Sequence, residues 1–252
     1  MKTSLSVITI THNNEDLLDH CLNSVKNIAT EIVVIDDQSQ DQTIAIAKQY
    51  KAKIWVHSSK ELGRKTYGIK KATSQWILIL DTDEIVSKAL SKEIRQIINS
   101  PNAKDAYFIP YQNHLFGKPL HYGGENYQMI RFFRKGAVEI KSALVHEEIK
   151  IKKGSVGYLK AKIYHYSYRS IRQIFTKFTD YGIRDARQKH EKHEKSSLKK
   201  VFLYPPHLFW ARYIKDKGYL DGLTRIILDL GFAYMEWLTY AALAYYNITK
   251  PN

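Results

Sequence analysis

The chain has 252 residues, of which 44% are hydrophobic and 25% are charged. These values are ordinary for a globular protein, and they exclude a chain that is disordered throughout. The single cysteine, Cys21, excludes an internal disulfide framework and a cysteine-rich zinc site, and it favours a reducing compartment. We expect no signal peptide, because the first residues lead directly into a strand-like segment.

Positive charge is concentrated in the second part of the chain. Residues 151–252 contain 19 Lys and Arg against 8 Asp and Glu, whereas residues 1–150 contain 20 against 17. This asymmetry predicts contact with something anionic, either a lipid surface or a nucleic acid, although a basic protein without such a partner has the same composition. No nucleic-acid-binding motif accompanies the charge, so an RNA-binding module is disfavoured and no nucleic-acid partner is expected.

Short apolar segments alternate with helical patterns through the first hundred residues. The patterns predict buried strands at 5–11, 31–35, 53–57 and 76–80. A first helix is expected to open within residues 13–16 and to carry apolar residues up to Val25. Further helices are expected over 44–50 and 64–74, and from Ser87 or Ser91 onward. This alternation predicts an α/β protein with a mostly parallel sheet that is covered by helices on both faces.

Three different sequence patterns follow one another after residue 100. Strand-like pieces at 106–110, 129–134, 157–159 and 162–166 predict a mixed extension of the sheet, and residues 170–200 have a polar helical pattern. Residues 198–246 are rich in aromatic residues, with basic side chains interspersed. The apolar stretch 223–246 is interrupted by Arg225, Asp229 and Glu236, which disfavours a membrane-spanning helix. It predicts an amphipathic helix, either packed on protein or lying in a membrane interface.

Carboxylates follow two of the predicted strands directly. Asp36 and Asp37 come after the second strand, and Asp81 and Asp83 come after the fourth. Parallel sheets bind ligands beyond the carboxyl ends of their strands, so two acidic clusters at one edge favour a polar ligand over simple helix capping. Mg²⁺ is commonly held by one or two carboxylates together with substrate phosphates, which makes the Asp-x-Asp pair a candidate seat for a metal diphosphate.

Three ordered motifs in residues 4–100 carry a resemblance to a known family. They are the opening strand with its Thr, Asn and Glu residues, the segment IDDQSQDQT at 35–43 and the segment WILILDTDE at 76–84. Together they resemble the family-2 glycosyltransferases of the glycosyltransferase-A fold. The resemblance implies a mostly parallel Rossmann-like sheet with a mixed-sheet extension and a helical C-terminal region. The catalytic domain is then expected at 1–168, with a nucleotide-sugar half at 1–100 and an acceptor half at 101–168. The helical basic and aromatic region is expected at 169–252.

The same resemblance implies roles for individual residues. The divalent cation, Mg²⁺ or Mn²⁺, is expected on Asp83 and His165. The donor is expected to be a nucleoside diphosphate sugar, with UDP as the favoured nucleotide and Asp37 as the favoured contact of the base. The residues implied to bind this donor are Thr9, Thr11, Asp36, Asp37, Lys65 and Asp81.

The second half resembles, more loosely, a subgroup that acts in lipopolysaccharide-core and cell-surface glycan assembly. Its matching pieces include Val145-His146-Glu147 and Tyr164-His165-Tyr166. Inverting sugar transfer needs a carboxylate that takes the proton from the acceptor hydroxyl. Glu147 matches the family's His-Glu segment and is the expected base, with Glu148 as its rival and Glu125 as a weaker one. Arg131 and Arg134 are expected either at a diphosphate or anionic acceptor, or facing solvent.

Together these features predict one enzymatic activity and leave two alternatives open. The chain is expected to be a metal-dependent inverting glycosyltransferase that acts on a cell-surface glycan or lipid-linked saccharide. It is expected in the cytoplasm, bound peripherally to the anionic inner face of the cytoplasmic membrane. The alternatives are a polyprenyl-phosphate glycosyltransferase and a non-catalytic binding protein that keeps the nucleotide-sugar fold.

Overall fold

The computed structural model describes residues 4–58, 63–141, 148–152 and 154–249. Contacts within the chain divide it into two compact units. The first contains the described residues of Met1–Tyr111, Tyr127–Ala143 and Glu147–His165, and the second contains those of Gln112–Asn126 and Tyr166–Asn252. The segment 112–126 therefore belongs with the C-terminal helices.

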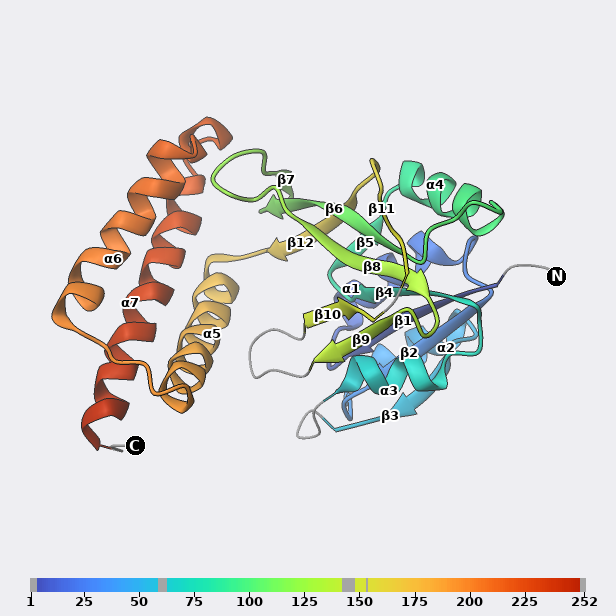
Figure 1. Ribbon diagram of the computed structural model, residues 1–252, viewed down its shortest axis with the longest axis horizontal. Coiled ribbons are helices and arrows are strands. Elements are labelled where there is room, and N and C mark those ends of the chain that lie inside the picture. Colours follow the sequence, from blue (N-terminus) through green and yellow to red (C-terminus); the bar gives the residue numbers. More distant parts are fainter. Residues whose placement is uncertain (1–3, 59–62, 142–147, 153, 250–252) are drawn as a thin grey trace. The chain divides into compact units, whose positions relative to one another are not determined.

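A parallel sheet forms the centre of the first unit (Figure 1). Its strands are ordered β3 (Lys53–Val56), β2 (Glu31–Asp36), β1 (Leu5–Thr11) and β4 (Trp76–Asp81). Apolar residues point to both faces, because Leu78 belongs to one core cluster and its neighbours Ile77 and Ile79 belong to another. A sheet that is buried on both faces needs such continuous apolar strands. The predicted α/β class is therefore confirmed.

Helices cover the two faces of this sheet. They are α1 (Glu15–Val25), α2 (Thr43–Gln49), α3 (Arg64–Lys71) and α4 (Lys88–Ile98). The Ser87 side chain accepts a hydrogen bond from the Leu90 backbone and caps α4, which selects Ser87 over Ser91 as its start. In α3, a Cβ at Gly68 would lie 2.5 Å from Ile8 Cγ2. The glycine therefore lets α3 pack directly on β1.

A mixed extension continues the sheet beyond β4, as the sequence predicts. Strand β8 (Gln128–Arg134) runs antiparallel to β4 and to β6 (Ala106–Leu115), and β12 (Ile163–Tyr168) runs antiparallel to β5 (Glu84–Val86). Strand β6 is longer than the predicted 106–110. The remaining strands are β7 (Lys118–Pro119), β9 (Val138–Lys141), β10 (Glu148–Ile151) and β11 (Val156–Tyr158).

The second unit is mainly helical. It contains α5 (Ile171–Glu191), α6 (Leu198–Trp210), the π-helical η1 (Ala211–Lys215), the 3-10 turn η2 (Gly218–Asp221) and α7 (Arg225–Thr249). The predicted helix over 170–200 is two helices, because Ser197 caps a new helix with its side chain. Helix α7 packs against both α5 and α6. Its core residues include Leu228 with Ile174 and Phe178 of α5.

Candidate active site at the carboxyl edge of the sheet

The acidic motifs meet at the carboxyl edge of the parallel strands. In the strand register, Thr11 lies opposite Asp36 on β2, and Ile10 lies opposite Asp81 on β4. Asp83 follows two residues after Asp81, in the turn that leads into β5. The sheet therefore brings both acidic clusters to one edge, where α/β proteins of this type bind ligands.

Asp81 is held by basic side chains from two different elements. Arg131 on β8 donates from Nη2 to Asp81 Oδ2 at 2.8 Å, and Lys65 Nζ on α3 lies 3.9 Å from Asp81 Oδ1. The same Arg131 Nη2 reaches Glu84 Oε1 at 3.3 Å, and its Nε donates to the Tyr111 hydroxyl at 2.8 Å. Arg131 is buried, and its third nitrogen, Nη1, has no hydrogen-bond partner among the described residues.

This arrangement fixes the charges at the edge. Burial alone would raise the pKa of Asp81, but Arg131 and Lys65 outweigh it and hold that pKa well below its usual range. For Glu84, burial dominates and raises the pKa, and the neighbouring charge of Asp81 adds to the rise although Arg131 opposes it. The edge therefore presents a fixed negative charge on Asp81 that is tied to a permanently positive guanidinium.

The second carboxylate of the motif faces the histidine that the sequence singles out. His165 Nε2 lies 3.4 Å from Asp83 Oδ2, because β12 pairs with β5 and sets His165 opposite Glu84. His165 Nδ1 lies 3.3 Å from the Tyr127 hydroxyl, and Tyr127 stacks on Tyr111 with ring centroids 5.0 Å apart. Tyr127 thus orients the imidazole, and its hydroxyl can accept a hydrogen bond from Nδ1–H in the tautomer that leaves Nε2 available for a metal.

The donor set tests whether a divalent cation fits here. Among the described residues, no group of three or more His, Cys, Asp and Glu side chains could hold a metal ion. Asp83 and His165 supply one carboxylate and one imidazole, while Asp81 is already engaged by Arg131 and Lys65. Two protein ligands fit Mg²⁺ or Mn²⁺ when oxygen atoms of a substrate diphosphate complete the coordination.

The two aspartates after β2 differ in their surroundings. The Asp36 carboxylate accepts hydrogen bonds from the Ser39 backbone N–H at 3.0 Å and from the Ser39 hydroxyl at 2.5 Å, so it holds the following loop. The Asp37 carboxylate lies 3.4 Å from Arg64 Nη1 at the start of α3, and its backbone carbonyl contacts His12 Nδ1 at 2.6 Å. Asp36 therefore holds its own loop, whereas the Asp37 carboxylate contacts the start of α3.

The two threonines of β1 lie at different depths. Thr11 ends the strand, is 2% exposed and has a buried hydroxyl with no hydrogen-bond partner among the described residues. An unsatisfied hydroxyl at the ligand edge is a natural contact for a polar ligand. Thr9 lies two residues earlier and is fully buried between β2 and β4, away from the edge itself.

The structure describes the side chain of one of the three glutamates that are candidates for the catalytic base. Glu147 lies outside the described residues, as does the side chain of its rival Glu148. Glu125 is buried in the second unit, where it accepts hydrogen bonds from Arg212 Nη2 and, at 2.7 Å, from Asn113 Nδ2, and where Arg225 Nη2 lies 3.4 Å away. A carboxylate that is shared by two guanidinium groups acts as a structural ion-pair partner, which disfavours Glu125, the weaker rival, as the base.

Sequence reasoning also underestimated one arginine of β8. Both Arg131 and Arg134 were open to a ligand-binding or a solvent-facing interpretation. Arg131 instead joins Asp81, Glu84 and Tyr111 inside the first unit. Arg134 stacks over Trp76 at 4.4 Å and lies 3.8 Å from Asp105. Arg131 lies between the core residues Ile130 and Phe132. That position could have indicated a buried arginine, but it does not indicate which residues Arg131 contacts.

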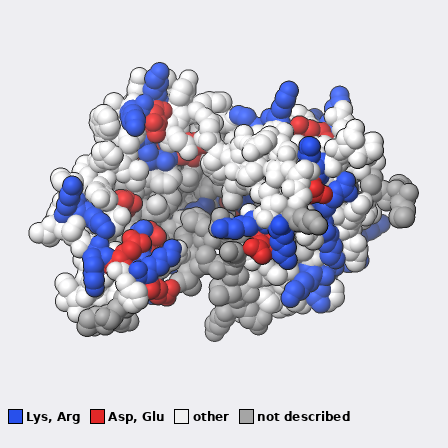
Figure 2. Space-filling view, in the orientation of Figure 1, with Lys and Arg blue, Asp and Glu red and all other residues white. Residues whose placement is uncertain are grey.

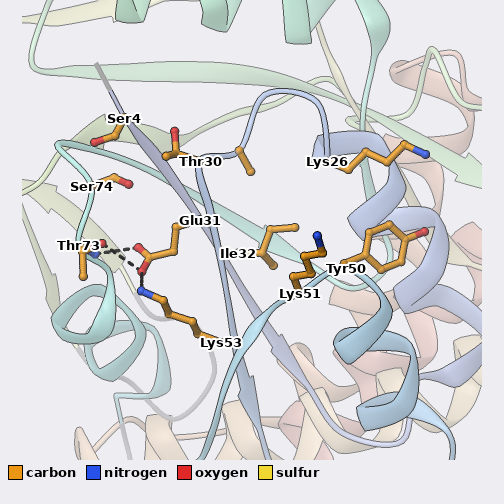
Figure 3. Close-up of a pocket in the computed structure, with 11 residues that line it drawn as sticks. Ser4, Lys26, Thr30, Glu31, Ile32, Tyr50, Lys51, Lys53, Thr73 and Ser74 are labelled. Carbon is orange, nitrogen blue, oxygen red and sulfur yellow. Dashed lines mark hydrogen bonds and ion pairs between the residues drawn. The ribbon is translucent and has the colours of Figure 1, made fainter. Parts of the chain in front are cut away.

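A separate pocket of about 400 Å³ lies at the opposite, amino edge of the sheet (Figure 3). Its lining includes Glu31 at the start of β2 and Lys53 at the start of β3. The Lys53 ammonium pairs with Glu31 at 2.7 Å. The acidic motifs end their strands at the other edge, so this pocket is distinct from the candidate site.

Comparison with known proteins identifies the family of the chain. Residues 6–147 match the model of the family "Glycosyl transferase family 2", which is more than half of the chain. The chain therefore belongs to glycosyltransferase family 2, and it is a glycosyltransferase.

Two relatives and one solved structure match over nearly the whole chain. An uncharacterised glycosyltransferase of Rickettsia felis is 28% identical, covering 95% of this chain and 89% of its own length. The lipopolysaccharide core biosynthesis glycosyltransferase LpsC of Rhizobium meliloti is 26% identical, covering 100% and 96%. The crystal structure of S. aureus TarS residues 1–349 with UDP-GlcNAc has a TM-score of 0.51 at 15% identity, covering 98% and 92%. This last similarity supports the glycosyltransferase-A fold.

Proposed function

We propose that the chain transfers a sugar from a nucleoside diphosphate sugar to a hydroxyl group of a cell-surface glycan or lipid-linked saccharide. The observation that carries the proposal is the edge geometry. Asp81 is held by Arg131 and Lys65. Asp83, two residues after Asp81, faces His165. One carboxylate is therefore fixed for hydrogen bonding, and the other is placed for a cation.

The donor's nucleotide would lie over the ends of β1 and β2. Asp37 would accept hydrogen bonds from the base, Thr11 would offer its free hydroxyl, and Asp36 would keep the loop in place. Asp81 would contact the ribose or the transferred sugar, and Lys65 would neutralise part of the diphosphate charge. UDP is the favoured nucleotide, as in the TarS complex with UDP-GlcNAc.

Asp83 and His165 would hold the divalent cation, Mg²⁺ or Mn²⁺. When bound, such a cation neutralises the charge that develops on the departing diphosphate. The chain's own part is to set the ligands: β5 and β12 align the two side chains, and Tyr127 fixes the imidazole. Arg131 supplies a second, permanent positive charge next to Asp81.

Glu147 would remove the proton from the acceptor hydroxyl as that oxygen attacks the sugar. The bond from sugar to diphosphate then breaks in the same displacement, so the anomeric configuration inverts. Direct displacement needs no covalent enzyme intermediate.

The acceptor would be met at the cytoplasmic face of the membrane, with the enzyme bound peripherally. The near full-length similarity to LpsC favours a saccharide of the cell envelope. A polyprenyl-phosphate acceptor is compatible with the same donor site. A binding protein without catalysis would show nucleotide affinity without sugar release.

Release of free sugar from a panel of nucleotide sugars, with Mn²⁺ and without acceptor, tests the proposal. One donor should be hydrolysed slowly, and Asp83→Asn should reduce the rate at least about a hundredfold. Asp180→Asn, which removes an exposed ion pair with Arg184 on α5, is the matched control and should keep the rate. Nucleotide binding without hydrolysis or transfer of any donor would favour the binding protein instead.

A further inference from the structure

The solvent-facing side of α6 is apolar. Phe202 is 64% exposed, Leu203 is 57% exposed and Trp210 is 50% exposed. Phe202, Pro206 and Trp210 follow at intervals of four residues, so they share one face of the helix. The segment 201–211 contains no Lys, Arg, Asp or Glu. A helix on a protein surface normally turns charged or polar residues to solvent, and α6 does the reverse.

The opposite side of α6 is already occupied by protein. Val201 packs into the core cluster that contains Tyr240 and Leu243 of α7. The Tyr204 ring meets the Tyr240 ring edge-on, with centroids 5.4 Å apart. Because these contacts satisfy one side of α6, the outward Phe202, Leu203 and Trp210 are not explained by folding of the second unit.

The apolar surface continues into the turn after α6. Ile214, Tyr219 and Leu220 are between 46% and 53% exposed, and Leu223 is 82% exposed. We call the outward residues of this region the α6 face, which consists of Phe202, Leu203, Pro206, Trp210, Ile214, Tyr219, Leu220 and Leu223. Several large apolar side chains exposed on one helix and the turn after it are typical of an interaction site.

Positive charges lie at both ends of the α6 face. Lys199 is exposed near the start of α6, and Lys215 and Lys217 are exposed beyond its end. Figure 2 shows uncharged surface over the middle of α6, with Lys and Arg side chains toward its two ends. An apolar strip that carries Trp and Phe between flanking lysines matches the boundary layer of a bilayer with anionic headgroups.

Helix α7 has a different role. It is the one helix of the described residues that is long and apolar enough to cross a membrane, with a mean hydropathy of 1.3 over its most apolar window. However, Arg225 in its first turn is fully buried and donates from Nε to Asp229 at 2.9 Å. The helix also packs on both α5 and α6. These contacts tie α7 to the rest of the helical unit, with 28% of its most apolar window buried.

We propose that the α6 face is a membrane-docking surface that inserts Phe202, Leu203 and Trp210 into the interface of an anionic lipid bilayer, with α6 lying in the membrane plane. The proposal deepens the peripheral membrane association proposed above and rests on it. It does not depend on the donor site, since the residues that carry it belong to the second unit.

Sedimentation with vesicles tests the α6 face in the full-length chain. We expect binding to vesicles of phosphatidylcholine with phosphatidylglycerol, and weaker binding to phosphatidylcholine alone or at high salt. The double variant Phe202→Gln, Trp210→Gln should lower the partition coefficient at least about tenfold, because two half-exposed aromatic side chains lose their burial in lipid. Ile171→Gln is the matched control, since Ile171 is 51% exposed at the start of α5.

Tryptophan quenching by brominated lipids provides a second measurement that separates insertion from surface attraction. Quenching should be lost in Trp210→Phe and retained in Trp55→Phe, since Trp55 lies in the first unit. Equal vesicle binding of the double variant and the parent, or no binding by the parent, would overturn the proposal.

Self-association and nucleotide binding give two further results that bear on the α6 face. A parent that is dimeric in solution, with a double variant that is monomeric, would show that a second copy covers the α6 face and would overturn the proposal. Nucleotide-dependent thermal stabilisation should be the same in the parent and the double variant. If neither the parent nor the double variant were stabilised by nucleotide, the proposed donor site would be contradicted. The vesicle-binding result would still stand.

Discussion

Arg131 Nη2 donates a 2.8 Å hydrogen bond to Asp81 Oδ2, and this contact joins β8 to the end of β4. The same guanidinium reaches Glu84 and the Tyr111 hydroxyl. One side chain from the mixed part of the sheet thereby holds the first carboxylate of the Asp-x-Asp motif. The donor edge depends on both parts of the sheet.

Replacing this arginine should affect stability and donor binding together. Arg131→Met leaves the buried Glu84 carboxylate without its cation and leaves the partly exposed Asp81 with Lys65 alone, so we expect a loss of about 3 kcal/mol in the free energy of unfolding. Denaturant titration measures it. Arg134→Met, which removes a partly exposed arginine from the same strand, should cost about 1 kcal/mol or less. Equal losses in the two variants would contradict the assigned role of Arg131.

Tyr127 should influence the cation without touching it. In Tyr127→Phe the His165 ring loses the hydroxyl that lies 3.3 Å from Nδ1, so we expect Mn²⁺ affinity in the presence of nucleotide to fall about tenfold. Isothermal titration with Mn²⁺ measures this change. Tyr158→Phe removes an exposed hydroxyl from β11 and should leave the affinity unchanged. An unchanged affinity in Tyr127→Phe would show that the hydroxyl does not orient His165.

Glu31 should make the fold sensitive to acid. Burial opposes ionisation of Glu31, but hydrogen bonds from Lys53, Ser6 and Thr73 lower its pKa from 4.5 to about 2. Figure 3 shows the bonds from Lys53 and Thr73. The folded state thus binds the proton less tightly than the unfolded state. The stabilisation is complete above about pH 5 and is lost as the pH falls toward 2, with a total of up to about 3 kcal/mol.

Unfolding measured from pH 6 to pH 3 tests this dependence. In Glu31→Gln the part of the slope that belongs to this carboxyl should disappear. The variant should also be less stable than the parent near neutral pH and approach it in acid. Parallel pH profiles of the two proteins would show that Glu31 has no such linkage.

The buried ion pairs of the second unit should be essential for its fold. Arg225 is fully buried against Asp229, and it also contacts Glu125 and the carbonyl oxygens of Tyr122 and Gly123. Arg225→Met should lower the free energy of unfolding by about 3–5 kcal/mol, because it leaves the buried Asp229 and Glu125 carboxylates with Arg212 as their one remaining cation among the described residues. Arg184→Met breaks an exposed pair on α5 and should cost less than about 1 kcal/mol. Similar costs for both variants would contradict the structural role of the cluster.

A single methyl group should disturb the packing of α3. In Gly68→Ala the new Cβ would approach Ile8 Cγ2 to 2.5 Å, so the helix or Ile8 must shift, at a cost of about 1–3 kcal/mol. Because Lys65 is on the same helix, nucleotide affinity should fall as well. Gly136→Ala is not an equivalent control, since Gly136 has a positive φ of 93°. Ser91→Ala on α4 is a suitable one, and wild-type stability in Gly68→Ala would refute the close packing.

The long strands of the first unit could be predicted from their own sequence patterns. The short strands, which form by pairing with neighbouring strands, could not. The β-branched runs at 5–11 and 76–80 predicted β1 and β4 with nearly the observed bounds, since buried parallel strands have a strong apolar pattern. Strands β5 and β7 have only three and two residues, too few for a periodicity. They form because longer partners, β12 and β6, lie beside them.

The candidate site also contains residues that could be predicted from the sequence and contacts that could not. The acidic residues were predictable because strand ends in a parallel sheet share an edge, and His165 was predictable through the family resemblance. The partnership of Arg131 with Asp81 spans 50 residues and depends on how β8 pairs with β4. The ion pairs of Glu125 were not predictable for the same reason, since its partners Arg212 and Arg225 lie far along the chain.

Thermal stabilisation by nucleotides, with and without Mn²⁺, tests the central claim most directly. One nucleoside diphosphate, with UDP expected, should stabilise the parent by about 2.7 kcal/mol at a hundred times its dissociation constant. The shift should require Mn²⁺ or Mg²⁺ for its full size and should lose that dependence in Asp83→Asn. A folded protein that shows no shift with any nucleotide or nucleotide sugar would contradict the account.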